Sequence, residues 1–272
     1  MAHIAHLFNN TTLSGGLSYF DYEYQVAQEI VIPWLNRHID LRGKSVGDFG
    51  CHQGGILQAF RELAHIRSGR GYDLNADSIR NSPFIENASF SLNVGDILAL
   101  SPESNPEHRF DVILIRDVLE HIPDYTGVLI KAYTCLNPGG HLFISFPPYY
   151  SPFGGHQQLA DNWAKLMPYL HYLPESLLFN LVQLSDNNYM HAKDSEADMR
   201  SVRTTRLTLT KTEKGLQRAG LQLVNRNCFL LRPEFKIRYG LPSLSCDMIG
   251  HIPILKEVLT MGVYYLAQKP AQ

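Results

Sequence analysis

The stretch Val46–Gly55, VGDFGCHQGG, decides which fold the rest of the chain can adopt. An apolar run ends within it and a pattern of helical spacing follows, so a strand passes into a helix through glycines. A glycine-rich turn at such a junction presents backbone N–H groups to a ligand, and the missing side chains let the ligand come close. His52 stands inside this turn, and its effect on that ligand bears on whether the chain is an enzyme.

Length and composition are those of an ordinary globular protein. The chain has 272 residues, 44% of them hydrophobic and 18% charged, which suffices for one large domain or two small ones. The formal net charge of −2 provides no electrostatic footprint for nucleic acid. We therefore expect a small-molecule or protein partner and no nucleic acid.

Four cysteines are spread over the chain without a CxxC pair: Cys51, Cys135, Cys228 and Cys246. This spacing argues against a zinc site and against a disulfide framework, and we expect no metal. The opening residues lack the pattern of a secretory signal, and no apolar run approaches membrane-spanning length. A cytoplasmic protein without membrane contact is expected.

The rhythm of apolar residues divides the chain into four parts. Short apolar runs alternate with helical patterns, which is typical of a parallel sheet covered by helices. We expect this α/β core at 42–150, preceded by a helical segment at 1–41 and completed by 208–272. An aromatic-rich insertion at 151–207 is expected to form a helical cap over the substrate, and a second insertion occupies 233–260.

Seven runs are expected to be strands: 44–49, 69–74, 89–94, 110–115, 139–146, 221–231 and 261–269. Before them, residues 18–39 have helical spacing and begin with Tyr19, Phe20, Tyr22 and Tyr24. A packing helix is the favoured interpretation. The alternative is a lid whose aromatic rings close over a site.

Carboxylates follow three successive strands. Asp48 ends the first strand, and Asp73 ends the second, where a carboxylate can accept two hydrogen bonds from ribose hydroxyls. Asp96 follows the third and is placed to receive an adenine amine. A single such carboxylate is typically a helix cap, but three at corresponding positions favour a nucleoside ligand.

Five segments resemble the successive motifs of class I S-adenosylmethionine-dependent methyltransferases, close to the small-molecule branch: VGDFGCHQGG, GYDLNADSI, Gly95–Asp96, FDVILIRDVLEHIPD and LNPGGHLFISFPP. The resemblance covers about residues 40–148. It implies a Rossmann-like α/β fold, with a seven-stranded, mostly parallel sheet whose last strand is reversed and helices on both faces. It also implies that S-adenosyl-L-methionine lies across the strand ends and leaves as S-adenosyl-L-homocysteine.

The resemblance implies cofactor contacts from Asp48, Gly50, Gly54, Asp73, Asp96 and Asp117, the last beside the methionine end. The neighbours Cys51, His52, Leu74 and Ile97 complete the expected cofactor site. His52 departs from the family pattern, which has glycine there. A left-handed backbone would cost histidine about 1–2 kcal/mol more than glycine, so we expect a reshaped but working pocket.

Acceptor residues are expected in the loop FPPYYSPFGGHQQ, which follows the fifth strand, and in the cap. Removing the proton of an oxygen acceptor needs a base, and His156 is our candidate. Glu120 and His121 are interpreted as structural or adjacent to the cofactor. The expected substrate contacts are Tyr22, Tyr149, Tyr150, Phe153, Gln157, Trp163 and His171.

These features favour a methyltransferase acting on a small, partly apolar or aromatic metabolite, with oxygen slightly preferred as the acceptor atom. One alternative is a non-catalytic module in which His52 blocks the cofactor and the aromatic cap is a partner surface. Methylation of protein or nucleic acid is a third interpretation, disfavoured by the near-neutral charge. A homodimer is compatible with the sequence but not required by it.

Overall fold

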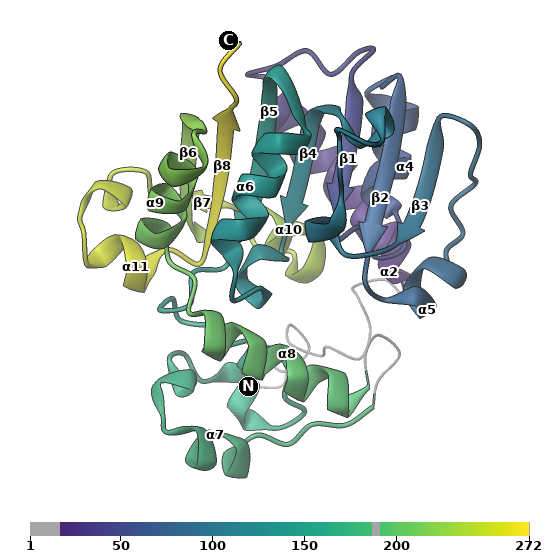
Figure 1. Cartoon of the computed structure of the whole chain (residues 1–272). Coiled ribbons are helices and arrows are strands. Elements are labelled where there is room, and N and C mark those ends of the chain that lie inside the picture. The colour runs from purple at the N-terminus through teal and green to yellow at the C-terminus, as the bar shows by residue number, and fades with distance from the viewer. Residues whose placement is uncertain (1–16, 187–190, 272) are drawn as a thin grey trace.

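The computed structural model describes residues 17–186 and 191–271, which build one eight-stranded sheet with helices around it (Figure 1). The strand order is β3-β2-β1-β4-β5-β8-β6-β7. The strands are β1 (Ser45–Phe49), β2 (Ser68–Asp73), β3 (Phe90–Val94), β4 (Phe110–Arg116), β5 (Leu136–Phe146), β6 (Gln222–Leu231), β7 (Leu244–Ser245) and β8 (Gly262–Gln268).

The neighbouring strands in the order β3-β2-β1-β4-β5 are all parallel, whereas β8 runs antiparallel to both β5 and β6. The expected α/β class and the reversed last strand are therefore confirmed. All seven expected strands occur, but the sheet contains eight strands rather than seven. The additional strand, β7, pairs antiparallel with β6 and lies within the insertion at 233–260.

Helices complete the described structure. The α-helices are α2 (Tyr19–Val26), α3 (Ile32–Leu35), α4 (Gly55–Leu63), α5 (Ala76–Arg80), α6 (Tyr125–Cys135), α7 (Glu175–Leu181), α8 (Ala192–Thr205), α9 (Leu209–Ala219), α10 (Glu234–Tyr239) and α11 (Leu255–Leu259). Short 3-10 turns occupy Ile97–Ala99, Pro106–His108, Leu119–His121, Gln157–Leu159, Trp163–Leu166, Leu170–Tyr172 and Ile249–His251. Within the described residues, no helix is both long enough and apolar enough to cross a bilayer.

Both faces of the sheet are buried, as alternate residues of β4 illustrate. Ile113 and Ile115 belong to a core shared with α6 and α9, while Val112 and Leu114 belong to a second core shared with α2, α3 and α4. Successive side chains of a strand point to opposite faces, so a strand covered on both sides is apolar throughout. This explains the uninterrupted apolar run in β4.

The N-terminal segment forms a nearly continuous helix from α2 to α3, with a π-helical turn at Ala27–Val31 between them. Pro33 follows this turn; it lacks an N–H and crowds the carbonyl one turn earlier, which accounts for the widened turn. The helix packs closely on α4, since a Cβ added to Gly55 would lie 2.3 Å from the carbonyl oxygen of Phe20. Glycine at this position therefore allows α2 to lie against the turn after β1.

Residues 147–208 leave the sheet after β5 and contain α7 and α8. In Figure 1 these helices lie beyond the end of the sheet to which the arrowheads of β2 and β4 point. The segment has its own apolar core, formed by Ala160, Ala164, Leu170, Leu178, Val182 and Met199. The insertion therefore faces the carboxyl ends of the parallel strands.

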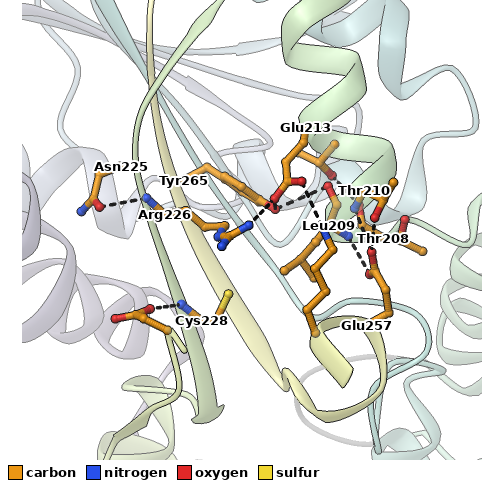
Figure 2. A network of polar contacts seen from close by, with 12 residues as sticks. Thr208, Leu209, Thr210, Glu213, Asn225, Arg226, Cys228, Glu257 and Tyr265 are labelled. Atoms are coloured by element: carbon orange, nitrogen blue, oxygen red, sulfur yellow. Dashed lines mark hydrogen bonds and ion pairs between the residues drawn. The ribbon is translucent and has the colours of Figure 1, made fainter. Parts of the chain in front are cut away.

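Glu257 of α11 fixes the start of α9 (Figure 2). Its carboxylate accepts hydrogen bonds from the backbone N–H groups of Leu209 and Thr210, each at 2.9 Å, and from the Thr210 hydroxyl at 2.7 Å. A carboxylate at a helix N-terminus satisfies unpaired N–H groups and complements the helix dipole. The insertion at 233–260 is thereby attached to the edge of the core.

Two glycines with left-handed backbone allow a matched test of packing after β1. Gly50 has φ 85° and Gly43 has φ 68°. A Cβ on Gly50 would lie 2.2 Å from Cγ2 of Val118, whereas nothing lies within 4 Å at Gly43. In both alanine variants the left-handed backbone should lower the free energy of unfolding by about 1–2 kcal/mol. Gly50→Ala should lower it by about 1–3 kcal/mol more, because the added methyl group overpacks the site. Urea unfolding measures both free energies, and equal losses would contradict the packing argument.

Candidate functional site

The turn after β1 contains three residues with left-handed backbone. Gly50, His52 and Gly54 have φ values of 85°, 47° and 81°. The N–H groups of Gly50 and Cys51 donate to the carbonyl oxygen of Tyr72 at 2.8 and 3.1 Å, which ties the turn to β2. His52 therefore carries the backbone strain that its place in the glycine motif implies.

The imidazole of His52 is directed toward the N-terminal helix. Its ring lies edge-on against the ring of Tyr19, with a centroid separation of 4.5 Å and an interplanar angle of 71°. Edge-to-face aromatic pairs of this kind are favourable contacts. The histidine in the turn thus links the glycine loop to α2.

Asp73 presents an oriented carboxylate at the end of β2. The backbone N–H of His52 donates to Oδ2 and that of Asn75 donates to Oδ1, both at 2.8 Å. A carboxylate offers about four acceptor positions, so about two remain on Asp73 for further donors. This arrangement suits a pair of ligand hydroxyls.

Asp96 follows β3 and caps the next 3-10 turn. Its Oδ1 accepts a hydrogen bond from the backbone N–H of Leu98 at 2.8 Å. Of the neighbouring residues expected at the cofactor, Ile97 is buried in the core and Leu74 exposes 74% of its surface. Asp96 therefore has a capping role, while its other acceptor positions remain available to a ligand.

Two buried polar atoms near the turn have no hydrogen-bond partner among the described residues: Oδ2 of Asp48 and Nδ1 of His52. Burial, followed by the charge of Glu23, raises the pKa of Asp48 to about 7, and burial lowers the pKa of His52. Unpaired buried polar groups are costly, so a polar ligand that pairs with them is favoured. With the oriented Asp73, these residues fit S-adenosylmethionine.

A buried ion network lies at the end of β4. Arg116 pairs with Glu23 of α2, and its Nη1 lies 2.8 Å from Oδ2 of Asp117. Arg232, just after β6, places Nη2 at 2.7 and 2.9 Å from the two oxygens of Asp117 and at 3.3 Å from Glu234. Burial opposes ionisation of Asp117, but the two arginines outweigh it and lower its pKa. Asp117 is therefore a fixed anion.

Asp198 of α8 joins two histidines from different elements. Its Oδ2 lies 2.7 Å from Nδ1 of His156, and its Oδ1 lies 3.3 Å from Nδ1 of His121. Burial tends to raise the pKa of Asp198, but the charge of the neighbouring His156 outweighs this effect, so the pKa of Asp198 is lowered. Burial lowers the pKa of His121 to about 4, so that this ring is neutral at pH 7. His156 itself has left-handed backbone, with φ 58°.

Glu120, next to His121, is buried with 2% exposure, and neither carboxylate oxygen has a hydrogen-bond partner within the part of the chain that the structure describes. Burial, followed by the charge of Asp117, raises its pKa well above the ordinary value. A buried carboxyl group of this kind is a frequent feature of functional sites.

A cavity of about 400 Å³ opens between α2, the end of β4, the loop after β5, α8 and α10. Its wall combines aromatic and ionisable side chains, namely Tyr19, Tyr22, Phe153, Phe235, Tyr239, Arg116, Asp117, Glu120, His121, His156, Asp198, Arg232, Glu234 and Arg238. The structure thus brings together four of the expected site residues: Tyr22, Asp117, Phe153 and His156. The carboxylates of Asp73 and Asp96 are not part of this lining.

Five expected substrate residues lie outside the lining of the cavity. Gln157 is buried and donates to the carbonyls of Pro152 and Met167, while Nε2 of His171 lies 2.7 Å from the carbonyl oxygen of Tyr149. Tyr149 is buried, whereas Tyr150 and Trp163 are exposed. Their contact with an acceptor stays a prediction.

Sequence reasoning did not anticipate Asp198, Arg116 or Arg232. Arg116 directly follows the apolar run of β4, and a charged residue at that position is a detectable signal. Asp198 and Arg232 carry no local signal, because their partners come from distant parts of the chain. The cavity therefore contains more charge than the motifs alone indicate.

Part of this chain is similar to curated methyltransferases. A ubiquinone biosynthesis O-methyltransferase from Stutzerimonas stutzeri is 28% identical over 114 residues, 42% of this chain and 49% of that protein. A tRNA U34 carboxymethyltransferase from a Sulfurovum species is 33% identical over 127 residues, 46% of this chain and 41% of that protein. The chain thus spans about half the length of the curated relatives it matches.

The fold is also found in solved structures. The plantazolicin methyltransferase BpumL, solved in complex with SAH, has a TM-score of 0.53 and 14% identity, with 99% of this chain and 89% of that chain covered. A family model described as a methyltransferase domain matches residues 22–186, more than half of the chain. The chain therefore belongs to the class I S-adenosylmethionine-dependent methyltransferases, enzymes whose cofactor is S-adenosylmethionine.

Proposed function

We propose that this enzyme methylates an oxygen atom of a small, partly apolar or aromatic metabolite. The observation that carries the proposal is the His156–Asp198 pair in the wall of the cavity, next to Asp117. A hydroxyl acceptor must lose its proton, and an imidazole whose Nδ1–H is held by a carboxylate has Nε2 as its proton acceptor. The similarity to proteins named ubiquinone biosynthesis O-methyltransferases supports oxygen as the acceptor atom.

S-adenosylmethionine supplies an electrophilic methyl group on a sulfonium. We assign its ribose hydroxyls to Asp73, whose carboxylate is oriented by two backbone N–H groups. Asp96 receives the adenine amine, and the glycine turn with His52 lies beside the methionine end. Asp117, held by two arginines, provides a fixed negative charge near the transferring group.

The cavity holds the acceptor. Its volume of about 400 Å³ suits a metabolite-sized molecule, and Tyr22, Phe153 and Phe235 supply apolar walls. Methyl transfer is an in-line displacement that needs the acceptor oxygen about 3–3.5 Å from the methyl carbon. Aromatic walls exclude water and orient the acceptor, and His156 receives its proton while Asp198 stabilises the resulting imidazolium.

A nucleic-acid acceptor is less well supported, although one similar protein is named as a tRNA enzyme. The formal net charge of −2 provides no general attraction for phosphates. The cavity is also bordered by the insertion at 151–207, and its volume of about 400 Å³ suits a metabolite rather than a polynucleotide. A small-molecule acceptor is the proposal that both features support.

Replacing Asp73 should weaken cofactor binding. Two hydrogen bonds to a carboxylate, at about 1.5–3 kcal/mol each, correspond to at least about a 100-fold loss of affinity in Asp73→Ala. Calorimetric titration with S-adenosylmethionine measures this affinity in the wild type and in the variant. Asp77→Ala, an exposed carboxylate four residues later, is the matched control and should bind normally. An unchanged affinity in Asp73→Ala would place the ribose elsewhere.

Replacing His156 should separate proton removal from cofactor binding. His156→Ala should lower turnover by roughly 10²- to 10⁴-fold and leave the affinity for S-adenosylmethionine nearly unchanged. The assay transfers labelled methyl groups to a panel of phenols and aliphatic alcohols. His191→Ala, which removes an exposed histidine beside Asp186, should retain full activity. If His156→Ala raises only the KM for the acceptor, His156 is a positioning residue and not the base.

A further inference from the structure

Three metal-ligating side chains converge on the cavity wall. Glu120, His121 and His156 each offer one ligand atom, and these atoms all lie within 4.8 Å of one another. Two imidazoles and one carboxylate form a donor set suited to Zn²⁺ and related divalent ions. The expectation of no metal rested on the spacing of the cysteines. That spacing does not bear on a site whose ligands are histidines and a carboxylate.

Both histidines are held through the same ring atom. Nδ1 of His156 lies 2.7 Å from Asp198. Nδ1 of His121 lies 2.8 Å from the hydroxyl of Ser201, which itself donates to the carbonyl oxygen of Asp198 at 2.7 Å and therefore accepts from His121. Each Nδ1 thus carries a proton, and each Nε2 has a free lone pair. Metal-ligating histidines are typically oriented in this way, by a partner behind the ring.

Glu120 provides an independent indication of a ligand. It is 2% exposed, and neither of its carboxylate oxygens has a hydrogen-bond partner within the described residues. Its Oε1 lies 3.8 Å from Nε2 of His121. A buried carboxylate without partners is unfavourable, and a cation between these groups would remove the penalty.

We propose that Glu120, His121 and His156 form a binding site for one divalent cation of the Zn²⁺ class, with an open coordination position toward the cavity. Three protein ligands and one open position are the usual arrangement of zinc sites that act on a substrate. The proposal does not rest on the proposed function, because binding requires neither cofactor nor acceptor. With the ion bound, Nε2 of His156 is a ligand, so ion binding and proton removal by His156 exclude one another.

The test titrates the full-length protein, stripped with EDTA, with ZnCl2 in a calorimeter. We expect one ion per chain. Asp198→Asn should weaken binding roughly 10- to 100-fold, the usual effect of losing the partner behind a ligand, and Glu120→Gln should weaken it at least as much. His191→Ala is the matched control for an exposed histidine–carboxylate pair and should leave the affinity unchanged.

Co²⁺ provides a second measurement, since four- or five-coordinate Co²⁺ absorbs visible light. The wild-type protein should develop these bands and Glu120→Gln should not, while circular dichroism verifies that the variant is folded. No Zn²⁺ binding by the wild type, or equal affinity in Glu120→Gln, would overturn the proposal. Neither result depends on methyl transfer, so failure of the proposed function would be seen separately.

Discussion

The carboxylate of Asp117 is the point on which the arrangement of the site depends. It pairs with Arg116 from β4 and with Arg232 from the end of β6, both almost completely buried. Removing one partner of a buried ion pair typically costs about 3–5 kcal/mol, because the remaining charge is left uncompensated. Segments far apart in the chain must therefore meet at Asp117 for any of these charges to be buried.

Further contacts extend this constraint around the cavity. Arg116 also pairs with Glu23, which fixes α2, and Arg232 pairs with Glu234, which accepts a hydrogen bond from Tyr264 of β8 at 2.7 Å. Because α2 also packs on the turn at Gly55, one helix borders both the glycine turn and the cavity. The turn and the cavity are thereby held in a fixed relation, which the proposed in-line transfer requires.

The opposite wall comes from the insertion after β5. Asp198 of α8 holds His156, and both Asp198 and Ser201 contact His121, which follows β4. The insertion is therefore joined to the sheet edge through polar contacts at the site itself. A change in the insertion would alter the cavity without changing the glycine turn, which joins β1 to α4.

Local patterns in the sequence determined the core. Apolar runs, the glycine turn and carboxylates at strand ends depend on residues close in the chain, so they predicted the α/β class, the seven main strands and the candidate residue His156. The eighth strand, Leu244–Ser245, was missed because two residues have no periodicity of their own.

The partners of the site were decided by tertiary structure alone. Asp198 lies 42 residues from His156, and Arg232 lies 115 residues from Asp117. Such pairs form only when packing of the insertion and of β6 brings them together, and no local pattern encodes that distance.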